Sequence, residues 1–351
     1  MKKALSFALA AAMMFSLAAC GSKKTPSGSG SSSTGGTSAG GDKKSYSISV
    51  GFTTSPSEYD PYNVTCEKFK EYVEEATDGR IQVEIYPGGQ LGSETEMFEG
   101  MQAGTLDMGI VTNAYVAAFV PSNGVFDLPF VFSDLEQARS VIDGDFGTKI
   151  LDAMQGSGVT GLGWSEGGFR QMATRKAIAS PADLAGTKIR CMETKTYLAA
   201  YASLGVNATP MAWGETITSL QQGAIDGMDA PLCVLYANGF ADVAAYCDLI
   251  NLFYSPLVIC MSDATLNQFD AEDQQLLKDC ATKAGIAVRE NNDSWETKMT
   301  EEMTNDGMTI IDQVDTVAFQ EKASSCYHDA DLCAYIGEEY VSELLSIVGI
   351  D

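Results

Sequence analysis

The chain has 351 residues, and its 22 lysines and arginines stand against 47 acidic residues, a formal net charge of −25 at pH 7. So negative a balance excludes functions that depend on long-range attraction to nucleic acid or to anionic lipid. An anionic ligand would have to be held by local cations, and each arginine near a cleft is therefore informative.

The first twenty residues predict a signal peptide. Two lysines precede an alanine-rich apolar run, residues 4–17, that is too short for a membrane span. Leu-Ala-Ala-Cys at 17–20 resembles a bacterial lipobox, which would make Cys20 the lipidated first residue of the mature protein. The alternative is a plain secretory signal in which Cys20 is incidental. Cleavage before Cys20 would remove no acid, leaving 20 basic against 47 acidic residues, or −27.

Residues 21–44 predict a flexible linker, because they are almost all Gly, Ser, Thr and Lys and carry no large apolar side chain. A lipid anchor followed by such a linker fits a soluble module held near a membrane. The folded body of about 300 residues is long enough for two lobes with hydrophobic cores.

The amino-terminal part of the body predicts an α/β lobe with a mainly parallel sheet. Apolar spacing predicts, in order, a strand from Tyr46, a helix over 57–76, a strand over 81–85, a helix from Ser93 and a strand over 106–111. Glu96, three residues after Ser93, completes a capping-box pattern.

A crossing between lobes is expected near Gly167-Gly168-Phe169-Arg170-Gln171. It follows predicted helices over 133–142 and 147–154 and a short predicted strand over 159–163. Two glycines before an aromatic residue and an arginine suit a hinge, because glycine absorbs dihedral change easily. Arg170 could equally form a structural salt bridge.

The central stretch carries the predicted binding site. A short strand ends at Arg190, and a second strand over 206–209 leads to Trp213 at the start of a helix. Arginine holds a carboxylate through two parallel hydrogen bonds, and a flat aromatic ring can pack on the ligand body. Each residue also has a structural interpretation, since Arg190 could pair with Glu193 and Trp213 could fill the core.

The carboxy-terminal part predicts mainly helix. A helical stretch continues to about Tyr246, a strand over 254–261 returns to the first lobe, and one amphipathic pattern covers 270–303. A helix of that length would span some 50 Å, enough to cross both lobes. A small strand at 309–311 and two short helices complete the chain.

The remaining cysteines and the single histidine support no catalytic or metal chemistry. The eight cysteines after Cys20 contain no C-x-x-C pair, so neither a zinc site nor a thioredoxin-like motif is expected. Their spacing shows no disulfide framework, which favours free thiols, with partial pairing as the alternative. His328 has no matching constellation for catalysis. We expect no metal and no cofactor.

Several ordered motifs between about Tyr46 and Phe253 are shared with a known family. They are Tyr86-Pro87 with Gln90-Leu91-Gly92, Phe126-Asp127-Leu128-Pro129-Phe130, Gly168-Phe169-Arg170-Gln171, Leu184 to Arg190, Thr209 to Glu215 and Leu220 to Gly227. In these motifs the chain resembles the substrate-binding proteins of TRAP-type transporters, the DctP-like extracytoplasmic solute receptors.

The resemblance implies an α/β, two-lobe periplasmic-binding-protein-like fold with a hinge and a long helix crossing both lobes. Lobe I would comprise 45–167 plus 255–295, and lobe II 168–254 plus 296–351. It also implies that Arg190 forms the main salt bridge to a substrate carboxylate, that Arg170 assists it, and that Trp213 packs on the ligand.

Two departures from the family pattern affect the site. Where the family often reads D-G-Q-E-N-P-L, residues 226–232 read D-G-M-D-A-P-L, so Ala230 replaces an asparagine donor. Asp229 could orient Arg190, accept a substrate hydroxyl or amine, or face solvent.

The second departure concerns the sialate-binding branch of the family. That branch carries a glutamate and an arginine at the positions where this chain has Thr112 and Tyr115. A sialic-acid ligand is therefore disfavoured. Together with Asn113, these residues suggest a first-lobe wall with neutral hydrogen-bonding groups and an aromatic face.

We therefore expect a lipid-anchored receptor that captures a small organic carboxylate by lobe closure. It would deliver the ligand to small and large TRAP membrane subunits for ion-gradient-driven uptake. A receptor that feeds a chemosensory or signalling partner is an alternative. A secreted enzyme is a third hypothesis, but no nucleophile–base set or metal cluster supports it.

Overall fold

The computed structural model describes residues 43–350; the predicted signal peptide, Cys20 and nearly all of the linker lie outside the described residues. From Lys44 on, the chain forms one compact unit. Among the described residues, no helix has both the length and the apolar character needed to cross a membrane.

The secondary structure alternates between strands and helices, with short 3₁₀ helices labelled η. The first part contains β1 (Tyr46–Gly51), α1 (Pro61–Ala76), β2 (Ile81–Tyr86), α2 (Glu94–Gln102), β3 (Met108–Thr112), α3 (Asn113–Val116), η1 (Pro121–Asp127), α4 (Leu135–Asp143), α5 (Asp145–Asp152) and β4 (Val159–Thr174). The second contains η2 (Pro181–Leu184), β5 (Ile189–Cys191), α6 (Lys195–Ser203), β6 (Thr209–Pro210), α7 (Trp213–Gln222), β7 (Gly227–Pro231), α8 (Leu232–Ala237), η3 (Phe240–Asp242) and β8 (Tyr246–Asp248). The last contains β9 (Tyr254–Ser262), α9 (Asp263–Leu266), α10 (Ala271–Asn305), β10 (Thr309–Ile311), α11 (Thr316–Ala323), η4 (Ser324–His328), α12 (Ala330–Ile336) and α13 (Glu338–Val348).

A mixed sheet with the strand order β2-β1-β3-β9-β4-β7-β5-β6 forms the framework, and β8 pairs with both β4 and β10. The outer triplets are parallel, β2-β1-β3 at one end and β7-β5-β6 at the other. Between them β9 runs antiparallel to β3 and β4, and β7 runs antiparallel to β4. We call the β1–β2–β3 side the first half and the β5–β6–β7 side, with β8 and β10, the second half.

β4 is the strand that joins the two halves. Val159 to Phe169 pair with β9, whereas Arg170 to Thr174 pair with β7. The register shifts between Glu166 and Phe169, and Gly168 there has a φ of 86°, a backbone conformation that favours glycine. The predicted crossing lies at this bulge, but the strand does not stop at 163 as predicted. It continues because β9, far along the chain, supplies its hydrogen-bond partners.

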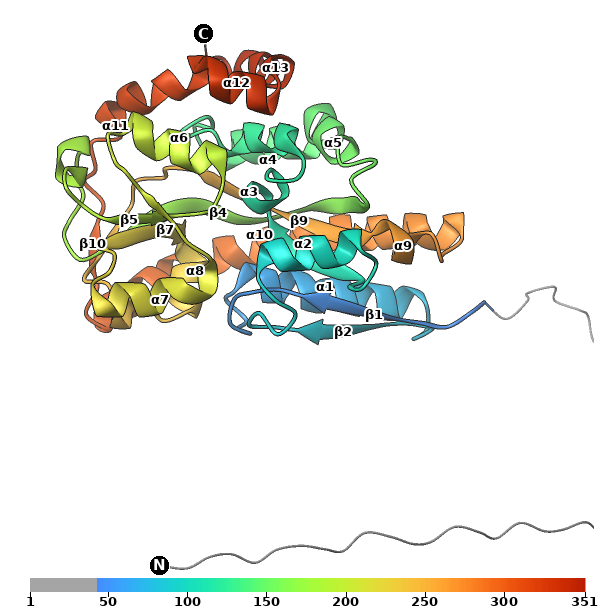
Figure 1. The fold of residues 1–351 in the computed structure, drawn as a ribbon. Coiled ribbons are helices and arrows are strands. Elements are labelled where there is room, and N and C mark those ends of the chain that lie inside the picture. The colour runs from blue at the N-terminus through green and yellow to red at the C-terminus, as the bar shows by residue number, and fades with distance from the viewer. Residues whose placement is uncertain (1–42, 351) are drawn as a thin grey trace, which may run out of the picture. The chain divides into compact units, whose positions relative to one another are not determined.

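α10 contacts elements of both halves. It is 35 residues long, about 50 Å from end to end, and its bounds lie close to the predicted 270–303. It packs on α1 and β4 and also on α8 and β10 (Figure 1). The carboxy-terminal helices α11, α12 and α13 lie at the top of Figure 1, beyond α6 and α4.

Two hydrophobic clusters cover the two faces of the sheet. Successive residues of β9 alternate between them, Val258 and Cys260 in one cluster and Leu257 and Ile259 in the other, as the period of a strand requires. The eight cysteines of the described chain are all free thiols, and every one except Cys333 is buried. Free thiols were the favoured prediction.

Three local predictions are wrong. The helix after Leu232 ends at Ala237, where Gly239 turns with a φ of 72°, and β8 follows instead of helix to Tyr246. The predicted strand over 206–209 shortens to Thr209–Pro210. Three α-helices, not two, follow β10. The exact bounds of the two lobes stay a prediction.

Candidate functional site

A small cavity of about 20 Å³ lies between the two halves of the sheet. The first half contributes Thr53, Thr54, Tyr62, Glu94, Thr112 and Tyr115. The second half contributes Arg170, Arg190, Met192, Trp213, Ala230, Pro231 and Val234. The cavity thus brings together five of the seven predicted site residues.

Arg190 is a buried cation with spare hydrogen-bonding capacity. It lies in β5 with 1% of its surface exposed. Its Nε donates to the carbonyl oxygen of Met211 at 2.9 Å, and Nη2 donates to the hydroxyl of Tyr115 at 3.3 Å. Among the described residues, Nη1 has no hydrogen-bond partner and the guanidinium has no ion pair. Pairing with the exposed Glu193 is therefore wrong, and an anion in the cavity would compensate the buried charge.

Arg170 lines the same cavity but is already paired. Its Nε donates to Asp229 Oδ2, Nη2 donates to the carbonyl oxygen of Asp229 at 2.5 Å, and Nη1 donates to Ser255 Oγ at 3.3 Å. Burial opposes its charge, but the Asp229 carboxylate keeps the pKa of Arg170 above its ordinary value. The guanidinium also lies 5.7 Å from the ring centroid of Tyr197. The salt-bridge interpretation of Arg170 is thus confirmed, and a supporting role toward the ligand stays a prediction.

Trp213 packs in the core and also lines the cavity, and its contact with a ligand stays a prediction. It opens α7, lines the cavity, and packs against Phe240 with ring centroids 5.7 Å apart. Because the indole is only partly buried, one part of it belongs to the core and another faces the cavity.

The first-half wall consists of hydroxyl groups and one carboxyl group. The hydroxyls of Thr112 and Tyr62 are 2.7 Å apart, and Thr112 donates to Glu94 Oε1 at 3.0 Å. Burial raises the pKa of Tyr115 to about 12, so its hydroxyl keeps its proton and can donate. This wall suits a ligand that carries hydroxyl groups.

Two predicted residues do not line the cavity. Asn113 is fully buried and donates to the carbonyl oxygen of Asn123 at 2.8 Å and to Asp127 Oδ2 at 3.1 Å. Asp229 is also fully buried. It accepts from Arg170 and, at 2.6 Å, from the hydroxyl of Tyr201. Their contact with a ligand stays a prediction; in the structure both hold neighbouring groups in place.

Sequence reasoning missed several lining residues, and Glu94 is the acidic one among them. It is the first residue of α2, and only 3% of it is exposed. Burial raises its pKa to about 7, although hydrogen bonds from Thr112 and the charge of Arg190 act in the opposite direction. Its Oε2 is buried and has no hydrogen-bond partner within residues 43–350. The capping box at Ser93 predicts that Glu94 lies in the first turn of a helix. It does not predict that other parts of the fold bury this turn.

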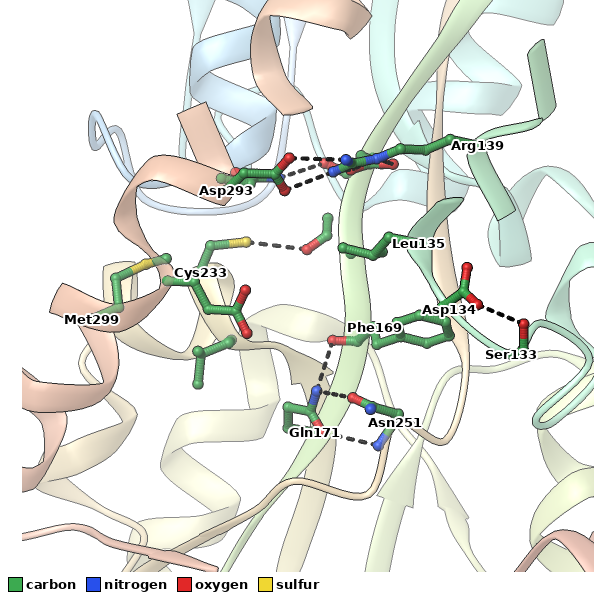
Figure 2. A pocket seen from close by; sticks show the side chains of 16 residues that line it. Ser133, Asp134, Leu135, Arg139, Phe169, Gln171, Cys233, Asn251, Asp293 and Met299 are labelled. Atoms are coloured by element: carbon green, nitrogen blue, oxygen red, sulfur yellow. Dashed lines mark hydrogen bonds and ion pairs between the residues drawn. The ribbon is translucent and has the colours of Figure 1, made fainter. Parts of the chain in front are cut away.

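A second, larger cavity of about 280 Å³ lies at the crossing, beside Phe169, Gln171 and α10 (Figure 2). Its only lining cation among the described residues, Arg139, is neutralised by two acids. Arg139 contacts Glu166 through Nε and Nη2 and Asp293 through Nη1 and Nη2. This cavity therefore lacks a spare cation for a carboxylate.

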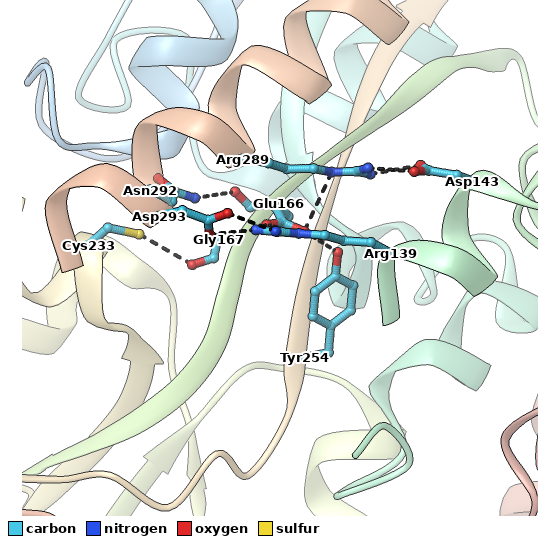
Figure 3. Close-up of polar contacts among 9 residues, drawn as sticks. All are labelled: Arg139, Asp143, Glu166, Gly167, Cys233, Tyr254, Arg289, Asn292 and Asp293. Atoms are coloured by element: carbon cyan, nitrogen blue, oxygen red, sulfur yellow. Dashed lines mark hydrogen bonds and ion pairs between the residues drawn. The ribbon is translucent and has the colours of Figure 1, made fainter. Parts of the chain in front are cut away.

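Several charged residues at that cavity belong to one network of ion pairs (Figure 3). Glu166 is fully buried and accepts from Arg139 and from the hydroxyl of Tyr254 at 2.6 Å. Arg289 of α10 holds Asp143 of α4 through two hydrogen bonds, 2.6 and 2.8 Å. Because Glu166 lies in β4 beside the bulge, the network fixes α4 and α10 to the crossing strand. Its position beside the bulge and its paired charges fit a structural role.

No group of three or more histidine, cysteine or acidic side chains suited to a metal ion occurs among residues 43–350.

Comparisons with known proteins agree on one family. A family model described as bacterial extracellular solute-binding protein, family 7 (DctP) matches residues 52–331. A solute-binding protein of Verminephrobacter eiseniae is 36% identical over 257 residues, which are 73% of this chain and 77% of the relative.

Two solved structures show what similar chains hold. A TRAP periplasmic solute-binding protein from Polaromonas sp. JS666, bound to D-erythronate, is 33% identical with a TM-score of 0.81 and covers 85% of this chain and 97% of its own. The sugar acid binding protein DctPAm from Advenella mimigardefordensis, in complex with galactonate, is 27% identical with a TM-score of 0.83 and covers 88% and 99%.

Proposed function

Because this chain belongs to family 7 of the bacterial extracellular solute-binding proteins, the DctP family, we propose that it captures a hydroxylated monocarboxylate and that Arg190 binds the carboxylate. Its family and its structural neighbours are substrate-binding receptors of TRAP systems, not enzymes. D-erythronate and galactonate, which two neighbours hold, are both of the proposed ligand class.

One observation carries the proposal: the buried guanidinium of Arg190 lines a cavity between the two halves and has no ion pair in the described part of the chain. A ligand carboxylate beside Nη1 would supply the negative charge that pairs with the Arg190 guanidinium. The hydroxyl groups of Tyr62, Thr112 and Tyr115 on the facing wall would bond to the hydroxyl groups of the ligand. Trp213 would cover the carbon chain.

Closure of the two halves would then exclude water and strengthen the pair between Arg190 and the carboxylate. Asn238, just after α8, connects the second half to the first. Its Oδ1 accepts from the backbone NH of Ser55 at 3.0 Å, and its Nδ2 donates to Asp60 Oδ2 at 3.2 Å. We propose that these bonds form on closure and that the bulge at Gly168 is the hinge.

Delivery to TRAP membrane subunits and ion-gradient-driven uptake are part of the same proposal. So is anchoring to the cell membrane through a lipid on Cys20, with the linker giving the receptor reach. Labelling of the intact protein with a radioactive fatty acid would test the anchor, and a Cys20→Ser variant should incorporate none.

Calorimetric titration with D-erythronate and D-galactonate tests the site. Arg190→Ala should weaken binding by about 30-fold or more, since truncating one partner of a buried charge pair costs roughly 2–5 kcal/mol. Arg190→Lys should recover only part, because lysine lacks the planar fork.

Lys188→Ala is the matched control, an exposed cation two residues earlier in the chain, and should bind like the unmodified protein. Near-normal binding by Arg190→Ala, or an equal loss in both variants, would refute the role of Arg190.

A further inference from the structure

The cavity contains one acidic side chain among its lining residues, Glu94, on the half of the sheet that faces Arg190. Its Oε1 accepts from Thr112 at 3.0 Å, and its Oε2 is buried with no partner among the described residues. Buried polar atoms are nearly always bonded, so an unpartnered oxygen in a wall of a binding cavity points to a group supplied by the ligand.

We propose that Glu94 is a specificity-determining residue that accepts a hydrogen bond from a ligand hydroxyl and excludes ligands with a second carboxylate. This inference rests on the proposed function, because it takes Arg190 as the site of the first carboxylate.

The balance of charge in the cavity supports the assignment. Asp229 neutralises Arg170, which leaves Arg190 as the lining cation without an acidic partner. One ligand carboxylate would neutralise Arg190. A second would have no cation left to pair with and would face Glu94 in a poorly hydrated space, where like charges repel strongly. A hydroxyl at the same place would donate to Oε2 without any such cost.

The arrangement makes the selectivity depend on pH. Around Glu94 stand the hydroxyls of Thr112, Tyr62 and Tyr115 and the cations of Arg190 and Arg170. With burial raising its pKa to about 7, Glu94 is largely protonated at pH 5.5 and largely ionised at pH 8.5. A protonated Glu94 no longer repels a second carboxylate and can donate a hydrogen bond to it.

Matched acid pairs test the proposal by calorimetry. D-erythronate and meso-tartrate differ only in that a terminal CH₂OH becomes a carboxylate, and D-galactonate and galactarate differ in the same way. At pH 8.5 the unmodified protein should bind the monoacid about 100-fold more tightly than the diacid, as expected for an unpaired like charge. In Glu94→Gln the ratio should fall below about tenfold, because the amide keeps the shape and can donate.

Glu96→Gln is the control, since it makes the same exchange on the same helix at an exposed position, and glutamine also serves in a capping box. Its ratio should equal that of the unmodified protein. Melting temperatures show whether each variant is folded. The unmodified protein gives a second test without any substitution. The factor by which it binds the monoacid more tightly than the diacid should become smaller when the pH is lowered from 8.5 to 5.5.

An unchanged ratio in folded Glu94→Gln, or a ratio in the unmodified protein that does not vary with pH, would overturn the role of Glu94. Both results leave the proposed function standing provided that the monoacids bind and Arg190→Ala weakens their binding as expected above. Failure of the unmodified protein to bind any monoacid would overturn the proposed function and this inference with it.

Discussion

The salt bridge between Arg170 and Asp229 lends itself to a quantitative test through Asp229→Ala. Both side chains are buried, Asp229 fully and Arg170 to 3% exposure. The substitution removes the carboxylate that pairs with Arg170 Nε and accepts from the hydroxyl of Tyr201. The bonds from Arg170 to the backbone oxygen at 229 and to Ser255 can remain, but neither supplies a negative charge.

The expected loss is about 3–5 kcal/mol, the usual cost of leaving one member of a buried ion pair without its partner. The unpaired hydroxyl of Tyr201 belongs to the same loss and is not added to it. A fold of this size typically has about 5–15 kcal/mol of stability, so roughly a fifth or more of it would disappear. At roughly 2 °C per kcal/mol, the melting temperature should fall by about 6–10 °C.

Urea unfolding of a double-mutant cycle measures this directly. Arg170→Ala should also be strongly destabilising. The double variant should lose less free energy of unfolding than the two single variants together, by about 2 kcal/mol or more. Asp242→Ala, an exposed acid in η3 of the same half, should stay within about 0.5 kcal/mol. Losses below about 1 kcal/mol, or additive losses, would refute the view that the pair acts as one buried unit.

Three further variants probe the hinge and one buried acid, Asp127. A Cβ on Gly168 would meet nothing within 4 Å but would take a φ of 86°, whereas one on Gly167 would meet Pro231 Cγ at 2.6 Å. In urea unfolding Gly168→Ala should therefore cost about 1 kcal/mol and Gly167→Ala more, and the reverse order would contradict this. Burial raises the pKa of Asp127 to about 8 despite a hydrogen bond from Asn113, so the folded chain keeps a proton that the unfolded chain loses near pH 4. The stability that this proton contributes is lost as the pH rises from about 4 to 8. Asp127→Asn should flatten that decline between pH 5.5 and 8, and identical pH profiles would count against it.

Local signals allowed much of the fold to be predicted. The capping box of Ser93 and Glu96 is present with both of its hydrogen bonds. The long helix begins and ends within two residues of the predicted bounds. Such features depend on neighbours in sequence. By contrast, β8 and the continuation of β4 depend on strand partners that lie far away along the chain, so apolar spacing did not reveal them.

The site shows the same division. Arg190 and Trp213 lie in motifs that carry their chemistry in the residues themselves, and the cavity brings them together. The partner of Arg170 lies 59 residues away in Asp229, and no local pattern connects the two. Glu94 is buried because Thr112, 18 residues later, contacts it across the first half. From sequence alone it looks like an ordinary acid in the first turn of a helix.

The free thiols have a consequence for life outside the cytoplasm. Thiolates are the form that oxidants and disulfides attack, and in this fold burial raises the pKa of Cys66, Cys233 and Cys260. The folded receptor therefore shields all of its described thiols except Cys333 from oxidants, without a disulfide among its described residues. A freshly exported, unfolded chain exposes every thiol at once. Resistance to oxidation therefore depends on the rate of folding, because the chain must fold before its cysteines react.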